Sequence, residues 1–245
     1  MFLQFIKCIR SYGMKRCKLF YTLIQLLIVM IKRIFMFVSG LFLMSLGVGF
    51  SIVSTLGTTP ISSISYALAL ITDINIGITT FIFNSALILI QIIILRSEFK
   101  KKRLLQFINC FLFGYFTDLS LYLLSFIPYE NSVFIYIIFL FISIFLIAFG
   151  IFVYMPANIA PLPGEGCVEA LSIAFNWRFS TVKICFDWTM VAVSLIMCGL
   201  FYTNLFGAVG IGTVISAFLV GFTLRKISDL YVRVTGREMN IVNRD

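Results

Sequence analysis

Two proline-led segments, GTTPISSISYALALIT (residues 57–72) and PLPGEGCVEALSIAFN (residues 161–176), organise this chain. Proline is well tolerated at the first position of a helix, so we predict short helices over residues 60–72 and 163–176. Thr59 precedes the first of them and is suited to cap it. A bilayer core of ~30 Å requires about 20 helical residues. Both helices are therefore too short to cross a membrane.

The composition around these segments excludes a soluble domain. Hydrophobic residues make up 61% of the 245 residues, charged residues make up 12%, and the mean hydropathy is +1.07. Soluble proteins are about half apolar and a quarter charged. The net charge of +9 does not indicate nucleic-acid binding, because the basic residues fall at the ends of apolar runs. The lipid bilayer is the expected surrounding.

Cysteine and histidine usage gives no sign of a metal or a cofactor. The six cysteines are scattered without a CxxC pair, and the sequence contains no histidine. A histidine-containing zinc site is therefore excluded, and a disulfide framework is not expected. We predict buried cysteines that act as small apolar residues.

Six apolar runs are long enough to be transmembrane helices. They cover residues 34–56, 77–95, 104–127, 132–155, 179–200 and 206–224. Basic clusters precede the first run, separate the second from the third (RSEFKKKR, residues 96–103) and follow the sixth. Because basic residues favour the cytoplasmic side, both termini are predicted to be cytoplasmic. The expected fold is an all-α polytopic membrane protein.

The two ends of the chain lie outside these runs. Residues 1–32 contain a 13-residue apolar stretch, residues 19–31, with basic residues on both sides. This pattern favours a separate amphipathic helix on the inner membrane surface. Residues 229–245 are predicted to form a cytoplasmic tail.

The sequence also contains an internal repeat. Residues 40–90 align without a gap with residues 143–193, so that Pro60 matches Pro163 and Asn84 matches Asp187. We therefore predict two related halves, residues 33–130 and 131–228, each with three transmembrane helices and one short helix. An odd number of crossings turns the second half upside down. Inverted repeats with broken short helices are typical of transporters, although surface helices that only connect spans would give the same pattern.

Several motifs give this chain the pattern of a known family. It has a glycine-rich first span, a Gly-x-x-Pro entry to a short helix, and a closing G-x-G-T-V-x-x-A-x-x-x-G span. The matching residues are Gly47, Gly49, Gly57–Pro60, Pro161–Gly164, Gly210–Val214, Ala217 and Gly221. Over residues 34–228 the chain resembles the YczE/YyaS/YitT group of bacterial membrane proteins. The resemblance implies a multi-pass protein of the bacterial cytoplasmic (inner) membrane.

The same family often has an acidic residue two places after the short-helix proline. Glu165 keeps this feature in the second half, whereas Ser62 replaces it in the first. A site that needs both carboxylates would therefore be incomplete here.

Ionisable and polar residues inside the spans are candidates for a substrate-binding site, because burying them in a membrane is costly. Asp187 lies about 12 Å from the inner end of its helix, and Asn84 lies equally far from the outer end of its own. Both therefore approach the bilayer midplane. The structural alternative is an i,i+4 ion pair of Asp187 with Lys183 that neutralises the carboxylate and has no role in binding.

The short helices supply further candidates. Glu165 and Glu169 share one helix face, where two close carboxylates would hold a proton between them or bind a cation. Helix capping with an ion pair to Arg178 or Lys183 would explain them equally well. Ser62 and Ser63 offer neutral hydrogen-bonding groups in the first short helix.

Two residues complete the expected binding site. Asp118 lies in the third span toward its outer end, and Trp188 follows Asp187 directly. Asp118 can reach the outer interface or a cavity, and Trp188 can line a site beside Asp187.

These features favour a small secondary transporter of a polar or cationic solute, with proton coupling as an option and no cofactor. A regulatory or assembly protein and the substrate-binding subunit of a multi-component importer are the alternatives. No nucleophile–base arrangement is visible, so an enzyme is not expected. Each of these functions is compatible with a homo-oligomer or with a partner protein in the membrane.

Overall fold

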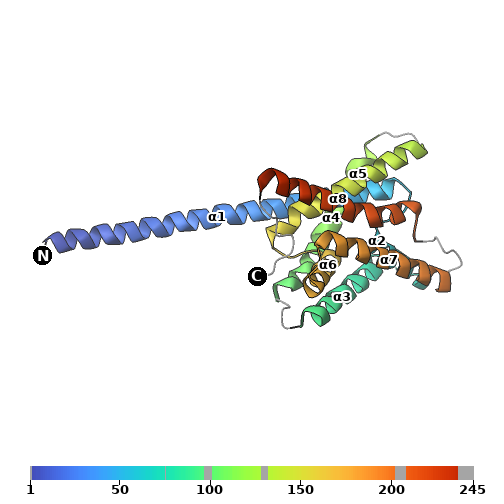
Figure 1. Ribbon diagram of the computed structural model, residues 1–245, viewed down its shortest axis with the longest axis horizontal. Helices are drawn as coiled ribbons and strands as arrows, with labels where there is room; N and C mark the ends of the chain where they lie inside the picture. Colours follow the sequence, from blue (N-terminus) through green and yellow to red (C-terminus); the bar gives the residue numbers. More distant parts are fainter. Residues whose placement is uncertain (1, 75, 97–100, 128–131, 202–207, 237–245) are drawn as a thin grey trace.

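A computed structural model describes residues 2–74, 76–96, 101–127, 132–201 and 208–236, and these residues form an all-helical bundle (Figure 1). In chain order its helices are α1 (Phe2–Val53), α2 (Pro60–Thr72), α3 (Ile76–Leu95), η2 (Lys101–Leu105), α4 (Gln106–Ser125), α5 (Val133–Tyr154), η3 (Met155–Ala157), α6 (Pro163–Phe175), α7 (Phe179–Phe201) and α8 (Ile211–Thr235).

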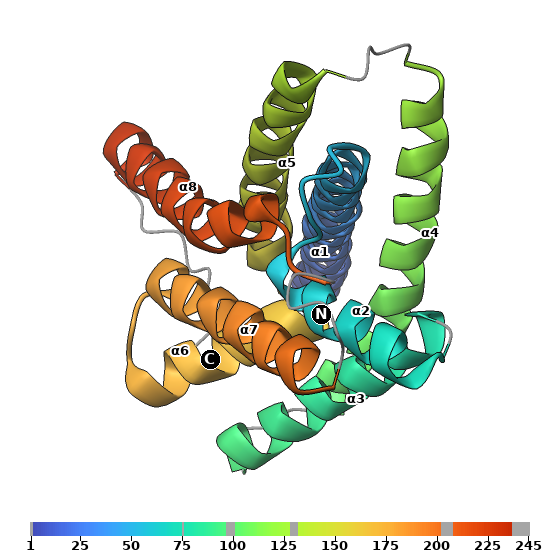
Figure 2. The same cartoon turned by 90° about the vertical axis from the view of Figure 1, so that its right-hand side faces the viewer.

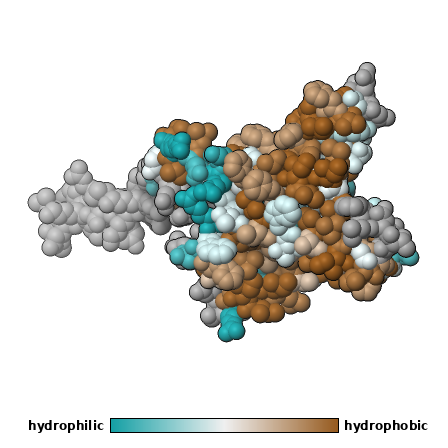
Figure 3. All heavy atoms as spheres, turned by 45° about the vertical axis from the view of Figure 1, so that its right-hand side comes forward, coloured by the Kyte–Doolittle hydropathy of each residue, from teal (hydrophilic) through white to brown (hydrophobic). Residues whose placement is uncertain are grey.

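Six segments are long and apolar enough to cross a membrane. They are Ile24–Val53, Ile78–Leu95, Arg103–Ser125, Val133–Ala157, Phe179–Phe201 and Ile211–Thr235. Each overlaps one of the six predicted runs. Large apolar side chains are exposed on their outer faces, such as Phe111 at 75% and Leu200 at 73%, and apolar colour covers most of the bundle in Figure 3. The chain is a multi-pass membrane protein.

The two predicted short helices are present. α2 has the predicted bounds, and α6 ends at Phe175 because Asn176 adopts a left-handed conformation with φ 55°. Thr59 occupies the N-cap position of α2 but makes no capping hydrogen bond with its side chain. Its hydroxyl instead lies 2.8 Å from the Ser62 hydroxyl. The predicted side-chain cap is therefore wrong.

Helix α1 is longer than predicted and projects from the bundle with the N-terminus at its free end (Figure 1). It runs without a break through Lys32 and Arg33, where the sequence predicts the border of a separate segment. Its 52 residues extend about 78 Å at 1.5 Å per residue, more than the ~30 Å apolar core of a bilayer. The location of residues 1–32 on the inner membrane surface stays a prediction.

Helices α1 and α5 form the centre of the bundle, and Figure 2 shows α1 nearly end-on between α5 and α4. A Cβ on Gly47 would lie 2.9 Å from the backbone nitrogen of Ile147, and one on Gly150 would lie 2.8 Å from that of Met44. Contacts at rising positions in α1 meet falling positions in α5, as in the Phe50–Phe139 ring pair. The two helices therefore run antiparallel, and small residues permit their close approach.

The remaining contacts form both within the halves and between them. α1 packs on α4 and α5 packs on α8, so each first helix contacts the last helix of its own half. In contrast, α2 packs against α7 and α6 packs against α3, so each short helix contacts a long helix from the other half. The core between the halves thus contains both short helices.

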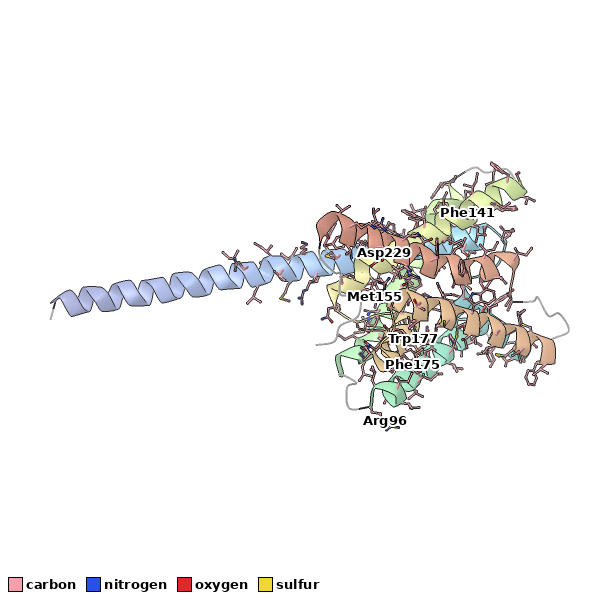
Figure 4. The ribbon with its side chains drawn as sticks, in the orientation of Figure 1. Arg96, Phe141, Met155, Phe175, Trp177 and Asp229 are labelled. Carbon is pink, nitrogen blue, oxygen red and sulfur yellow. The ribbon has the colours of Figure 1, made fainter. Side chains whose placement is uncertain are left out.

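Polar and basic residues gather at one end of the bundle. Hydrophilic colour in Figure 3 concentrates beside the projecting part of α1. Figure 4 shows Arg96, Met155 and Asp229 toward this same end, with Phe141 farther from it. Because α3 ends at this side next to Arg96 and the last turns of α8 contain Lys226 and Arg233, we refer to it as the basic end.

Candidate functional site

Helix α6 is the most enclosed polar segment of the structure. Nine of its 13 residues are buried, compared with five of 13 in α2. Its glycines permit this burial, since a Cβ on Gly166 would lie 2.7 Å from Oε1 of Gln91 and 2.8 Å from Nε2 of Gln106. A short helix that cannot span the bilayer is therefore surrounded by protein.

Lys183 of α7 lies at the centre of the charges around α6. Its Nζ donates a 2.6 Å hydrogen bond to Oδ1 of Asp187 and lies 4.0 Å from Oε1 of Glu165. The three residues are 3%, 1% and 2% exposed, respectively. The helical spacing of Lys183 and Asp187 aligns them on one face of α7, and α6 supplies the third group.

A second ion pair binds α6 to the basic end. Nη1 of Arg103 in η2 donates a 2.8 Å hydrogen bond to Oε2 of Glu169, whose side chain is 5% exposed. Glu165 and Glu169 are separated by one turn of α6. Together Arg103, Glu165, Glu169, Lys183 and Asp187 form what we call the ionic cluster.

Neutral polar groups surround the N-terminus of α6. The Gln91 and Gln106 amides exchange two hydrogen bonds of 3.0 and 2.8 Å, and Nε2 of Gln91 also donates to the carbonyl of Pro163 at 3.1 Å. Nδ2 of Asn109 donates to the carbonyl of Ala160 at 2.6 Å. These side chains come from α3 and α4, so both halves of the chain build the site.

The environment of Glu165 favours its neutral form. Burial raises the pKa of this carboxyl above its ordinary value, while Lys183 and a hydrogen bond to the backbone of Glu165 itself oppose the rise. The residue lies in the first turn of α6, where the positive end of the helix dipole also favours a carboxylate. Burial is the strongest of these influences.

Three of the predicted site residues meet in the ionic cluster: Asp187, Glu165 and Glu169. Glu169 contacts Arg103, and Glu165 lies 4.0 Å from Lys183, the ion pair that the structural alternative anticipated. A proton or cation shared by Glu165 and Glu169 stays a prediction. The alternative pair of Asp187 with Lys183 is present. Arg178, the other predicted partner, lies 3.8 Å from Asp229 instead.

The other predicted site residues lie apart from this cluster. Ser62 and Asp118 are exposed, and Trp188 is 44% exposed, so it points away from the cluster that its neighbour Asp187 joins. Asn84 is half-buried on α3. Ser63 is buried on α2, where its carbonyl accepts a 3.0 Å hydrogen bond from the Ser194 hydroxyl.

Sequence reasoning missed the roles of Lys183, Arg103 and Gln91. Lys183 is predicted as a partner of Asp187 or of the α6 glutamates, but not as a group that contacts both, and Arg103 is predicted only as part of a cytoplasmic basic cluster. Gln91 is the one polar residue in the apolar stretch ALILIQIIIL, residues 86–95, and this isolation was an available signal. Contacts across the halves could not be read from the sequence.

A metal centre is not formed by the described part of the chain. There, no group of three or more His, Cys, Asp or Glu side chains could hold a metal ion. Each carboxylate in the cluster instead faces a lysine or an arginine.

Comparison with known proteins identifies a family and relatives that match most of this chain. A family described as "Family of unknown function (DUF6198)" matches residues 31–229. The chain belongs to this family. Its match begins near Lys32 and ends in α8, so it includes both short helices and all or most of each of the six apolar helices.

Two bacterial proteins are similar over most of the DUF6198 chain. "Uncharacterized protein YyaS" of Bacillus subtilis is 27% identical over 185 residues, which cover 76% of this chain and 87% of the relative. An "Uncharacterized protein" of Haemophilus influenzae is 24% identical over 203 residues, which cover 83% and 86%, respectively. No solved structure matches. The YyaS relative agrees with the resemblance seen in the sequence.

Proposed function

We propose that this protein is a small secondary transporter of a polar or cationic solute, with its binding site around α6. The observation that carries the proposal is the ionic cluster, which combines Arg103 from the first half with four buried residues from the second. Ionisable groups are expensive inside a membrane protein and commonly mark a substrate or ion pathway. A purely structural bundle gains little from such a cluster, because buried ion pairs contribute weakly to stability.

We further propose that the two halves are inverted repeats. The bounds of α2 and α6 differ by 103 residues at both ends, from 60 to 163 and from 72 to 175. Left-handed residues follow the same spacing, with Thr55 matching Asn158 and Asp73 matching Asn176. The reciprocal contacts of Gly47 and Gly150 across an antiparallel helix pair support a two-fold axis perpendicular to the helices.

The proposed site lies within membrane depth. Asp187 is the ninth residue of α7 and lies about 12 Å from the start of this helix at 1.5 Å per residue. Backbone that enters a membrane without crossing it must be shielded by protein or face a water-filled cavity. The burial of α6 and its contacts with both halves meet the first condition.

The proposed orientation has both termini in the cytoplasm of a bacterial cell, with α2 near the outer side and α6 near the inner side. The equivalent positions Thr72 and Phe175 are both exposed and test this orientation. In a chain without its native cysteines, Thr72→Cys should react with an impermeant thiol reagent from outside, and Phe175→Cys only after the membrane is opened. Reaction of both from one side would contradict the inversion.

The transport proposal is tested with purified protein in liposomes. Uptake or exchange of a panel of cationic and polar solutes should be measured for the wild type, Asp187→Asn, Glu165→Gln and the control Asp73→Asn. Asp73 is exposed at the end of α2, and its left-handed conformation suits asparagine. We expect flux that both cluster variants reduce at least tenfold and that the control preserves.

Two results would contradict this function. One is the absence of flux for every solute, together with normal growth of cells that carry Asp187→Asn or Glu165→Gln. The other is co-purification of a stoichiometric partner that is required for activity. The second result would favour a regulatory protein or an importer subunit.

A further inference from the structure

The charges around Lys183 do not balance in the described part of the chain. One ammonium group serves two carboxylates, those of Asp187 and Glu165. Glu169 has its own arginine at 2.8 Å and is therefore separate from this count. The group Glu165–Lys183–Asp187, which we call the α6–α7 triad, would carry one excess negative charge if both carboxyls were ionised. An uncompensated charge at 1–3% exposure is strongly unfavourable.

The two carboxyl groups share the ammonium unequally. Asp187 accepts a direct 2.6 Å hydrogen bond from Lys183, whereas Glu165 lies at 4.0 Å, beyond hydrogen-bonding distance. The excess charge therefore falls on Glu165.

The other titratable groups near Glu165 that the structure describes do not supply the missing positive charge. Tyr154 of α5 and Cys110 of α4 interact electrostatically with Glu165, and both are neutral or negative in all their ionisation states. Glu169 lies one turn away on α6 and is occupied by Arg103 of η2. Gln91 of α3 and Gln106 of α4 are uncharged and bond to each other.

We propose that Glu165 binds one proton, and that the α6–α7 triad is the proton-coupling site of the transporter. Proton uptake converts the Glu165 carboxylate to a carboxylic acid and changes the triad from a charge of −1 to neutral. Release returns the proton to water and restores the charge. The inference builds on the transport function proposed above and adds the coupling ion and the residue that carries it.

The position of Glu165 suits reversible proton binding. Burial favours the carboxylic acid, while Lys183 and the N-terminus of α6 favour the carboxylate. A carboxyl group under opposed influences can both bind and release a proton, as required for coupling. Because α6 and α7 touch through this triad, its charge directly changes the attraction between the two helices.

Infrared spectroscopy of the full chain in lipid nanodiscs tests the proposal. A protonated carboxyl group gives a C=O band that a carboxylate lacks, and exposed glutamates are ionised at pH 7 because their ordinary pKa is about 4.3. We expect the wild type to show a band equal to one carboxylic acid per chain at pH 7. Labelling glutamate with ¹³C should shift this band, whereas labelling aspartate should not. This labelling experiment uses the wild-type chain alone.

Variants then locate the group. Glu165→Gln should remove the band, and the control Asp73→Asn should retain it. The proposal is overturned if no band appears at pH 7, if aspartate labelling shifts it, or if Glu165→Gln retains it in full. Loss of the band on adding Na⁺ or K⁺ at constant pH would also overturn it, since the site would then take a metal cation. The band is measured without any flux, so its result is independent of the transport assay.

Discussion

The two short helices of this protein share a backbone and differ in chemistry. α2 and α6 both have 13 residues, begin with proline after an extended residue, and end before a left-handed residue. Around α6, however, Glu165, Glu169, Lys183 and Asp187 are buried and ionic. The positions 103 residues earlier are Ser62, Tyr66, Thr80 and Asn84, all neutral.

This difference shows that backbone geometry and site chemistry are separable in the two halves. The fold of a short helix requires a proline, a terminal left-handed residue and a partner surface, and both helices have these. Buried charges are an additional feature that, among the described residues, only the α6 side has. If the protein transports a solute, we expect the two sides to contribute unequally to binding.

The largest expected effect comes from removing the central cation on the α6 side. Lys183→Met leaves Asp187 and Glu165 buried without a cation within 4.0 Å among the described residues. Breaking a buried ion pair in this way costs about 3–5 kcal/mol. Thermal unfolding in detergent should show a large loss of stability. Lys32→Met, at an exposed position of α1, is the control and should change stability by less than about 0.5 kcal/mol.

The next effect tests whether the centre of the bundle is symmetric, in contrast to the ionic cluster, which only one half has. Gly47→Ala and Gly150→Ala each place a Cβ within 2.9 Å of backbone atoms on the opposite helix. Both should lose about 1–3 kcal/mol by overpacking, and by similar amounts because the contacts are reciprocal. Gly114→Ala on α4 meets no atom within 4 Å and should be tolerated. A strongly unequal loss at the two α1–α5 positions would contradict the two-fold relation.

An effect of equal or smaller size distinguishes the neutral contacts that hold the two short helices. Gln91→Met removes three hydrogen bonds beside α6 and leaves the buried Gln106 amide without them, at a cost of about 1–3 kcal/mol. Ser194→Ala, at the equivalent position, removes one hydrogen bond to α2 and should cost about 0.5–1.5 kcal/mol. Amide hydrogen exchange should rise more in α6 for the first variant than in α2 for the second. The reverse order would show that α2 is the more tightly held helix.

The smallest effect comes from adding a carboxyl to the α2 side. Ser62→Glu restores the acidic residue that the second half has at Glu165, but this position is exposed. We therefore expect a change in stability within about ±0.5 kcal/mol. The new carboxyl should also add no carboxylic acid band at pH 7. A protonated glutamate at this position would show that α2 is enclosed as deeply as α6.

Much of the architecture could be predicted from local sequence signals. The six apolar runs, the proline at the start of each short helix and the matching order of segments predicted every long helix and both short ones. These features depend on hydropathy and backbone conformation within a few neighbouring residues. The break expected near Lys32 is absent, because basic side chains do not prevent a helix from continuing.

The candidate site could be predicted from the sequence only in part. Glu165, Glu169 and Asp187 were recognised because acidic residues in apolar segments are conspicuous, and the spacing of Lys183 and Asp187 allowed their pair to be foreseen. Trp188 was assigned to the site by its position next to Asp187. On a helix, however, adjacent residues point about 100° apart, and Trp188 is exposed.

Hydropathy and local spacing thus determined the class of protein, the number of crossings and the existence of two short helices. Tertiary structure alone decided that α6 packs on α3, that Arg103 reaches Glu169 and that one lysine lies between two carboxyls. The reason is physical: membrane insertion depends on the summed transfer energy of consecutive residues, which can be read along the chain. The charge balance of a buried site depends on distances between residues from separate helices, which exist only after the halves have packed.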